Sequence, residues 1–162
     1  MLDLLTSVTR RVRQHHAIEH ATITTLAHRL PGRRVSGISD PFGFTLFGNY
    51  DQAQVQKAVS EAMLRLQAGE SGLAIHPNCG TNLMTAGLLA ATATTLSRVG
   101  KRDAAGQFMR TALFIVPALV AAQPLGLRLQ EYTTLADVSG RWIVGVRTLR
   151  LGPVTIHRVV LE

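Results

Sequence analysis

The stretch HHAIEH, residues 15–20, lies at the centre of a helix that the sequence predicts over residues 1–30. On either side of it, apolar residues recur every three or four positions, at Leu5, Val8, Val12, Ile23, Leu26 and Leu30. The same spacing, continued through the stretch, falls on His16 and Glu19. A buried carboxylate requires a proton, a cation or a metal nearby, so this pattern indicates more than a packing helix.

His16 and His20 are one helical turn apart, which allows both imidazoles to bind one ion. With Glu19 they form His-x-x-Glu-His, the inverted form of the zinc-protease helix motif, in which two histidines bind zinc and the glutamate handles the proton of a bound water. One alternative is a histidine-rich interfacial helix whose polar residues face solvent. Another makes Glu19 itself a ligand, with His15 or His16, in a site suited to iron or manganese.

A second group of candidate ligands follows at His76 and Cys79, which are three residues apart in the loop HPNCG. A catalytic zinc needs at least three protein ligands and an open position, so the two helical histidines require such partners. Thr81 and Asn82 look like the cap of the next helix, and a cysteine at a helix start has its thiolate favoured. We therefore expect metal ligands and a catalytic glutamate at His16, His20, His76, Cys79 and Glu19.

The same residues have simpler interpretations. A lone His76 is equally well a satisfied loop histidine, and a lone Cys79 is more often a small buried hydrophobe. Because Cys79 is the single cysteine, an intramolecular disulfide is excluded. We expect His15, Asn78 and Asn82 either to hold a ligand in place or to polarise a substrate carbonyl, although a surface histidine and ordinary turn asparagines would also explain them.

The composition favours a membrane surface as the partner. Hydrophobic residues make up 46% of the 162 residues, and charged residues only 17%, where about a quarter is usual. The net charge of +7 suits nucleic acid or anionic lipid headgroups. Aromatic residues make up only 5%, and no nucleic-acid motif is present, so we expect membrane lipids and no nucleic acid.

Two uncharged runs, residues 71–97 and 111–127, predict a helical hairpin over 83–127 with a basic tip at 98–110. Its small residues favour a transmembrane hairpin, and a buried soluble αα-hairpin is the alternative. We expect Pro117 and Pro124 to kink the second helix or to end it early.

The remaining segments predict a small antiparallel sheet. A hairpin at 33–50 precedes a helix at about 52–68, and two strands at 142–146 and 154–160 flank a turn. The expected fold class is α+β, with an amphipathic N-terminal helix, this sheet and the transmembrane hairpin. We expect one membrane-associated domain over 1–162, made of a metal-binding part (1–75), the hairpin (83–127) and a β tail (128–162).

The motifs HAIEH at 16–20 and HPNCGT at 76–81 resemble the paired signature of the bacterial YqhQ-like family. Those are multi-pass membrane proteins predicted to be metal-dependent. The whole chain is more similar to a smaller bacterial family of unknown function that shares both motifs. The resemblance covers these motifs and the apolar run that follows them. It implies a metal site at His16, Glu19, His20, His76 and Cys79, and implies no substrate. The distant glutamate ligand of inverted-motif proteases has no counterpart that we can locate.

The leading functional expectation is a membrane-associated hydrolase that depends on zinc, with iron or manganese as alternatives, and acts on a peptide, a membrane protein or a lipid-linked bond at the bilayer surface. A non-enzymatic assembly or regulatory protein with a structural metal site is the alternative, and a thiol enzyme using Cys79 with His76 is a third. We expect the bacterial inner membrane, with the reduced cysteine towards the cytoplasm. The sequence indicates no oligomeric state.

Overall fold

The structure, a computed structural model, describes residues 2–98, 100 and 103–162. It divides into two compact units, the first comprising Met1–His76 and Thr133–Glu162, and the second Pro77–Tyr132. The predicted metal-binding part and the β tail thus fold together in the first unit. Lys101 and Arg102, in the predicted basic tip, lie outside the described residues.

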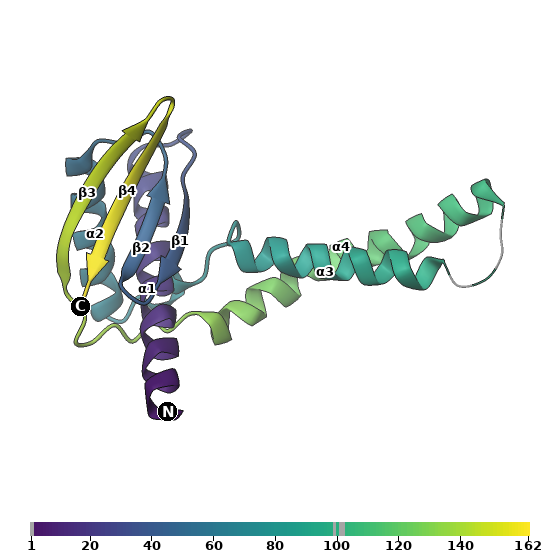
Figure 1. Cartoon of the computed structure of the whole chain (residues 1–162), viewed down its shortest axis with the longest axis horizontal. Helices are drawn as coiled ribbons and strands as arrows, with labels where there is room; N and C mark the ends of the chain where they lie inside the picture. The colour runs from purple at the N-terminus through teal and green to yellow at the C-terminus, as the bar shows by residue number, and fades with distance from the viewer. Residues whose placement is uncertain (1, 99, 101–102) are drawn as a thin grey trace. The chain divides into compact units, whose positions relative to one another are not determined.

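The first unit is an α+β fold, which confirms the expected class (Figure 1). Its sheet is antiparallel with the strand order β1-β2-β4-β3. The strands are β1 (Ser36–Asp40), β2 (Gly43–Phe47), β3 (Ile143–Leu151) and β4 (Val154–Leu161). The predicted 33–50 hairpin therefore pairs with the C-terminal strands through β2 and β4.

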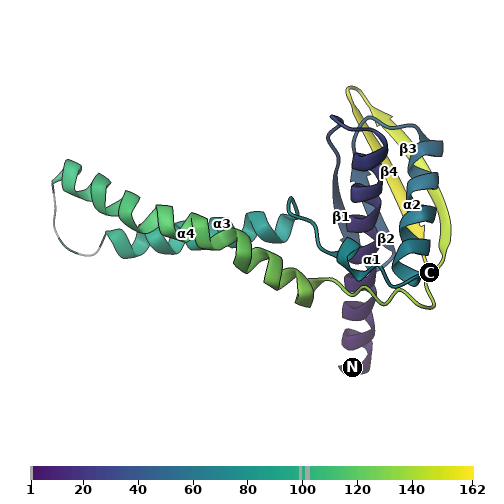
Figure 2. The ribbon, with the colours of Figure 1, turned by 180° about the vertical axis from the view of Figure 1, so that it is seen from behind.

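Two helices, α1 (Leu2–Arg29) and α2 (Gln52–Gln67), cover one face of this sheet (Figures 1 and 2). The first lies over β1 and β2, and the second over β3. A short 3₁₀ helix, η1 (Ser71–Ala74), packs against both. As the periodicity predicts, α2 buries one face, made of Val55, Val59, Ala62, Met63 and Leu66.

The apolar pattern of α1 describes its C-terminal half better than its beginning. Leu26 is buried as expected, whereas Leu5 is 59% exposed. Between residues 14 and 26, α1 is buried on nearly all sides, because the sheet, α2 and η1 all contact it. The four polar residues of the 15–20 stretch therefore lie in the interior of the unit or at its edge.

The second unit contains α3 (Gly80–Ser97) and α4 (Ala104–Thr133), the helices of the predicted hairpin. Pro117 and Pro124 lie inside α4, which continues through both, so neither ends the helix early, and the other expected effect, a kink, stays a prediction. Among the described helices, α4 is long and apolar enough to cross a membrane by length and composition, with a mean hydropathy of 1.7 in a window that is 11% buried.

Polar contacts join α3 to α4 near both ends of the hairpin. Gln130 Nε2 donates to Asn82 Oδ1 at 2.8 Å, and the absence of a side chain at Gly126 makes room for Asn82, whose Oδ1 would lie 2.4 Å from an added Cβ. Near the other end, the hydroxyls of Ser97 and Thr111 lie 2.9 Å apart. Side-chain hydrogen bonds of this kind and close glycine contacts also join helices in lipid.

The interior of the first unit makes its stability depend on pH. His157 is fully buried; its Nε2 donates to Gly48 O, and its Nδ1 contacts the Thr148 hydroxyl. Burial lowers the pKa of His157 below its ordinary 6.5. As the pH falls below about 6.5, the unfolded chain binds a proton that the folded chain excludes, so stability is lost.

We therefore expect the thermal-unfolding midpoint of the detergent-solubilised chain to fall between about pH 7 and pH 5, and to fall less in His157→Asn. The quantity to compare is the slope of the unfolding midpoint against pH, because the variant also loses packing at every pH. Equal slopes in the two proteins would contradict the assignment.

Candidate metal centre

His16 and His20 form the nucleus of the candidate site. Their rings stand edge to face with centroids 4.3 Å apart, and a ring nitrogen of one lies within 4.8 Å of a ring nitrogen of the other. The distance follows from their separation by one turn of α1. Two imidazoles at this distance can bind the same ion with small side-chain adjustments.

The Nδ1 atom of each imidazole faces a backbone carbonyl. His20 Nδ1 lies 2.7 Å from Ala74 O, and His16 Nδ1 lies 3.1 Å from Thr133 O. A carbonyl oxygen only accepts, so each Nδ1 carries a hydrogen, and Nε2 is left as the nitrogen that can present a lone pair to an ion. Metal-binding histidines in proteins are commonly oriented through the other ring nitrogen in this way.

The Nε2 atom of His20 is buried and has no hydrogen-bond partner among the described residues. An unsatisfied buried acceptor costs about 1–3 kcal/mol. A divalent ion at this nitrogen would remove that cost, and imidazole is a donor that zinc, iron and copper accept. The donor set of this chain thus fits a metal.

His76 brings a third imidazole to the same place. Its ring centroid lies 5.9 Å from that of His20, and it follows η1, whose Ala74 carbonyl already orients His20. The structure therefore brings together three of the sequence-predicted ligands, two from α1 and one from the loop that follows η1. Spacing alone could not establish this contact.

Cys79 belongs to the second unit, where it is the N-cap of α3. Thr81 N–H donates to its sulfur at 3.4 Å, so the cap is Cys79, not Thr81 or Asn82 as expected. A helix N-terminus favours a thiolate. With two residues between them, the Cα atoms of Cys79 and His76 can be at most about 11 Å apart, which keeps the sulfur available as a ligand.

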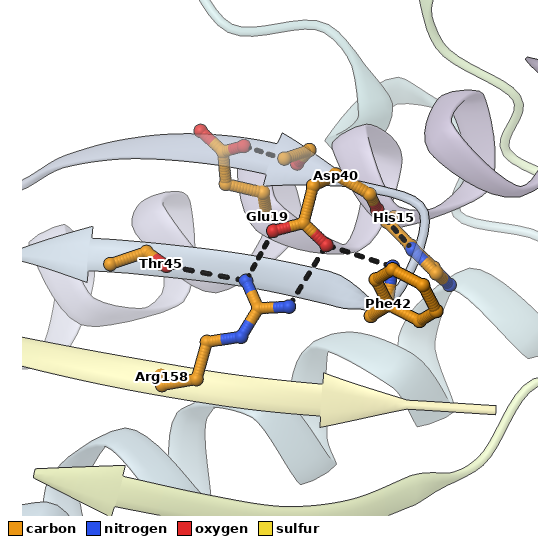
Figure 3. Close-up of polar contacts among 7 residues, drawn as sticks. His15, Glu19, Asp40, Phe42, Thr45 and Arg158 are labelled. Carbon is orange, nitrogen blue, oxygen red and sulfur yellow. Dashed lines mark hydrogen bonds and ion pairs between the residues drawn. The ribbon is translucent and has the colours of Figure 1, made fainter.

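Glu19 is buried at 4% exposure and lies against β1. Its carboxylate accepts a hydrogen bond from the Ser39 hydroxyl (Figure 3). The glycine at position 37 makes room for this contact, since a Cβ there would lie 2.5 Å from Glu19 Oε1 and the carboxylate would have to shift. The acid that the sequence pattern places beside the imidazoles is thus oriented by the sheet, through two residues for which the sequence offered no signal.

His15 also faces the sheet and is fully buried. Its Nδ1 donates to Asp40 O at 2.8 Å, while the Asp40 carboxylate binds both terminal nitrogens of Arg158 (Figure 3). Burial lowers the pKa of His15, and the Arg158 hydrogen bonds lower that of Asp40. His15 is therefore neutral at physiological pH and secures α1 to the end of β1.

The two candidate asparagines lie in the second unit. Together with Cys79 they line a groove of about 490 Å³, and its apolar lining includes Leu83, Ala86, Leu119 and Ala122. The Asn82 amide donates to Pro77 O at 2.6 Å and accepts from Gln130. Asn82 thus holds the loop and the helix pair together, and Asn78 lines the groove.

The fold and this cluster define a class: an α+β unit that contains a histidine-rich candidate metal site and whose sequence is interrupted between His76 and Thr133 by a long helical pair. The chain belongs to the family described as a domain of unknown function (DUF6391), which matches residues 11–146. That match contains every candidate ligand.

The chain is also similar to an uncharacterised protein of the cyanobacterium Picosynechococcus sp. (strain PCC 7002). The two are 39% identical over 153 residues, which cover 80% of this chain and 75% of the relative. No solved structure matches the chain.

We expect His20→Ala to weaken zinc binding by more than about 100-fold, since the change removes a ligand and not only its support. The measurement is competition with a zinc-sensitive chelating dye, with His28→Ala as the matched control, because His28 lies on the same helix and is exposed. Equal zinc affinity in the two variants would contradict the site.

A second variant tests the Glu19 contact. Gly37→Ala places a methyl group against the carboxylate and should cost about 1–3 kcal/mol in chemical denaturation. Gly145→Ala, in another strand where an added Cβ meets nothing within 4 Å, is the control and should be nearly neutral. A neutral Gly37→Ala would show that Glu19 lies elsewhere.

Proposed function

We propose that this protein is a membrane-associated, metal-dependent hydrolase, with zinc as its metal. The observation that carries the proposal is the buried, unpartnered Nε2 of His20, with the imidazoles of His16 and His76 around it and the buried carboxylate of Glu19 on the same helix. Neutral imidazoles and a nearby acid are the parts of a hydrolytic metal site.

The proposed ligands are His16, His20, His76 and Cys79. Nitrogen and sulfur donors favour zinc over manganese, which prefers oxygen. If Glu19 left Ser39 and entered the ligand set, iron or manganese would become the better fit. Elemental analysis of the purified chain separates these possibilities.

A divalent ion in this site would polarise a substrate carbonyl and lower the pKa of a bound water. Glu19 would accept the proton of that water and return it to the leaving group. Ser39 keeps the carboxylate on one side of α1, and burial beneath the sheet excludes bulk solvent from it. The Nδ1 atoms of His16 and His20 are occupied by carbonyl contacts, so Nε2 is the atom that each ring would offer to the ion.

The second unit supports the membrane part of the proposal. Large apolar side chains of α3 and α4 are exposed, among them Leu83, Met84, Leu88, Phe108, Leu113 and Val120, each at least 70% exposed. A bilayer would cover them. We propose the bacterial inner membrane, with a reduced, cytoplasm-facing Cys79, and a peptide, membrane protein or lipid-linked bond as substrate. The shared motifs also support a distant relationship to the YqhQ-like family.

The alternative function is a non-enzymatic metal clamp in a membrane assembly or regulatory protein. It is favoured by the carbonyl contacts of the histidines, since Ala74 lies just before the chain enters the second unit and Thr133 lies just after it returns. A metal bound to these histidines would hold α1 to the two segments that connect the units. Such a metal could be purely structural.

Cobalt substitution separates the two. A site with an exchangeable solvent ligand should show a visible spectrum that changes with pH around neutrality, and Glu19→Gln should shift that transition. The near-ultraviolet thiolate band should disappear in Cys79→Ser. A spectrum independent of pH would support the closed clamp and rule out the hydrolase.

A further inference from the structure

Residues 134–141 follow α4 and contact α1. Leu135 N–H donates to Arg13 O at 2.9 Å, and Gln14 Nε2 donates to Asp137 O at 2.7 Å. The segment then turns, with Arg141 N–H bonded to the carbonyl three residues before it at 3.0 Å. These contacts hold the segment that leads to Arg141 against residues 13 and 14 of α1, one turn after Arg10 and Arg11.

Arg10 and Arg11 add positive charge to the surroundings of Arg141. Arg10 Nη2 is 3.6 Å from Asp137 Oδ2, on the segment from which Arg141 emerges. Burial lowers the pKa of Arg141, and the positive charges of Arg11 and Arg10 lower it further. The Nε atom of Arg141 is buried and has no hydrogen-bond partner among the described residues.

The surrounding carboxylates do not balance this charge. Asp137 is the acid that contacts Arg10, and it also accepts hydrogen bonds from the backbone N–H and the hydroxyl of Ser139. No carboxylate among the described residues contributes to the pKa of Arg141. A partly desolvated cation beside two like charges is costly unless an anion joins it.

We propose that Arg10, Arg11 and Arg141 form a binding site for a phosphate-ester anion. Guanidinium groups present paired N–H donors that match phosphate oxygens, and they lose less hydration than ammonium groups when they do so. A phospholipid headgroup and free phosphate share this chemistry. Exposed Leu4 and Leu5, five to seven residues before the two arginines on α1, favour the headgroup, since apolar side chains beside arginines suit the lipid boundary.

This site needs no metal. It rests on the proposed function only in the membrane association, for which it names the part of the first unit that would contact lipid. Trp142, the single tryptophan, is adjacent to Arg141 and 56% exposed, so its fluorescence reports on the site directly. The experiment uses the full chain in a neutral detergent, titrated in turn with short-chain phosphatidylglycerol, short-chain phosphatidylcholine and inorganic phosphate.

The expected result is a saturable change in Trp142 emission with phosphatidylglycerol, weakened about tenfold or more in Arg141→Gln and in Arg11→Gln. Arg11 is exposed, so a folding defect would not explain its effect. Arg150→Gln, an exposed change of equal charge on β3, should leave the titration unchanged.

Saturation by inorganic phosphate with the same dependence on the variants would support the site and identify free phosphate as its ligand. Two results would overturn it: no saturable change with either anion, or an effect of Arg150→Gln equal to that of Arg141→Gln. Because no metal is added, failure here leaves the cobalt spectrum, and hence the hydrolase proposal, to stand or fall separately.

Discussion

Two hydrogen bonds from imidazole rings to backbone carbonyls organise this protein. They join His20 to Ala74 and His16 to Thr133, the points next to which the chain leaves the first unit and returns to it. The same bonds assign a hydrogen to Nδ1 and so leave Nε2 of each ring as the atom that can bind an ion. The turn of α1 between residues 16 and 20 therefore serves packing, chain connection and the candidate metal centre together.

Local patterning was sufficient for most of the fold. In α2 and in the four strands, apolar residues recur at the spacing that burial against one neighbouring layer requires. This spacing can be recognised in the sequence. Prediction from local patterns failed where the burial of a helix changes along its length or where a helix contains prolines. Leu5 continues the apolar pattern of α1 but lies where the helix has lost its cover, and α4 tolerates Pro117 and Pro124 in its interior.

In the candidate site, too, some contacts could be predicted from the sequence and others could not. The pairing of His16 with His20 follows from helical geometry, and the contact with His76 was inferred from chemistry and is present. The placement of Glu19 depends on Ser39 and Gly37, in a strand whose register on α1 no local pattern encodes. The carbonyls that orient the histidines were likewise invisible, because any residue type supplies a carbonyl.

The most direct test of this account is a long-range ¹H–¹⁵N correlation spectrum of the histidine side chains, recorded before and after zinc is added. We predict that His16 and His20 are neutral with the hydrogen on Nδ1, and that zinc shifts their Nε2 resonances. Hydrogen on Nε2 in the metal-free chain, or Nε2 resonances unmoved by stoichiometric zinc, would contradict the central claim.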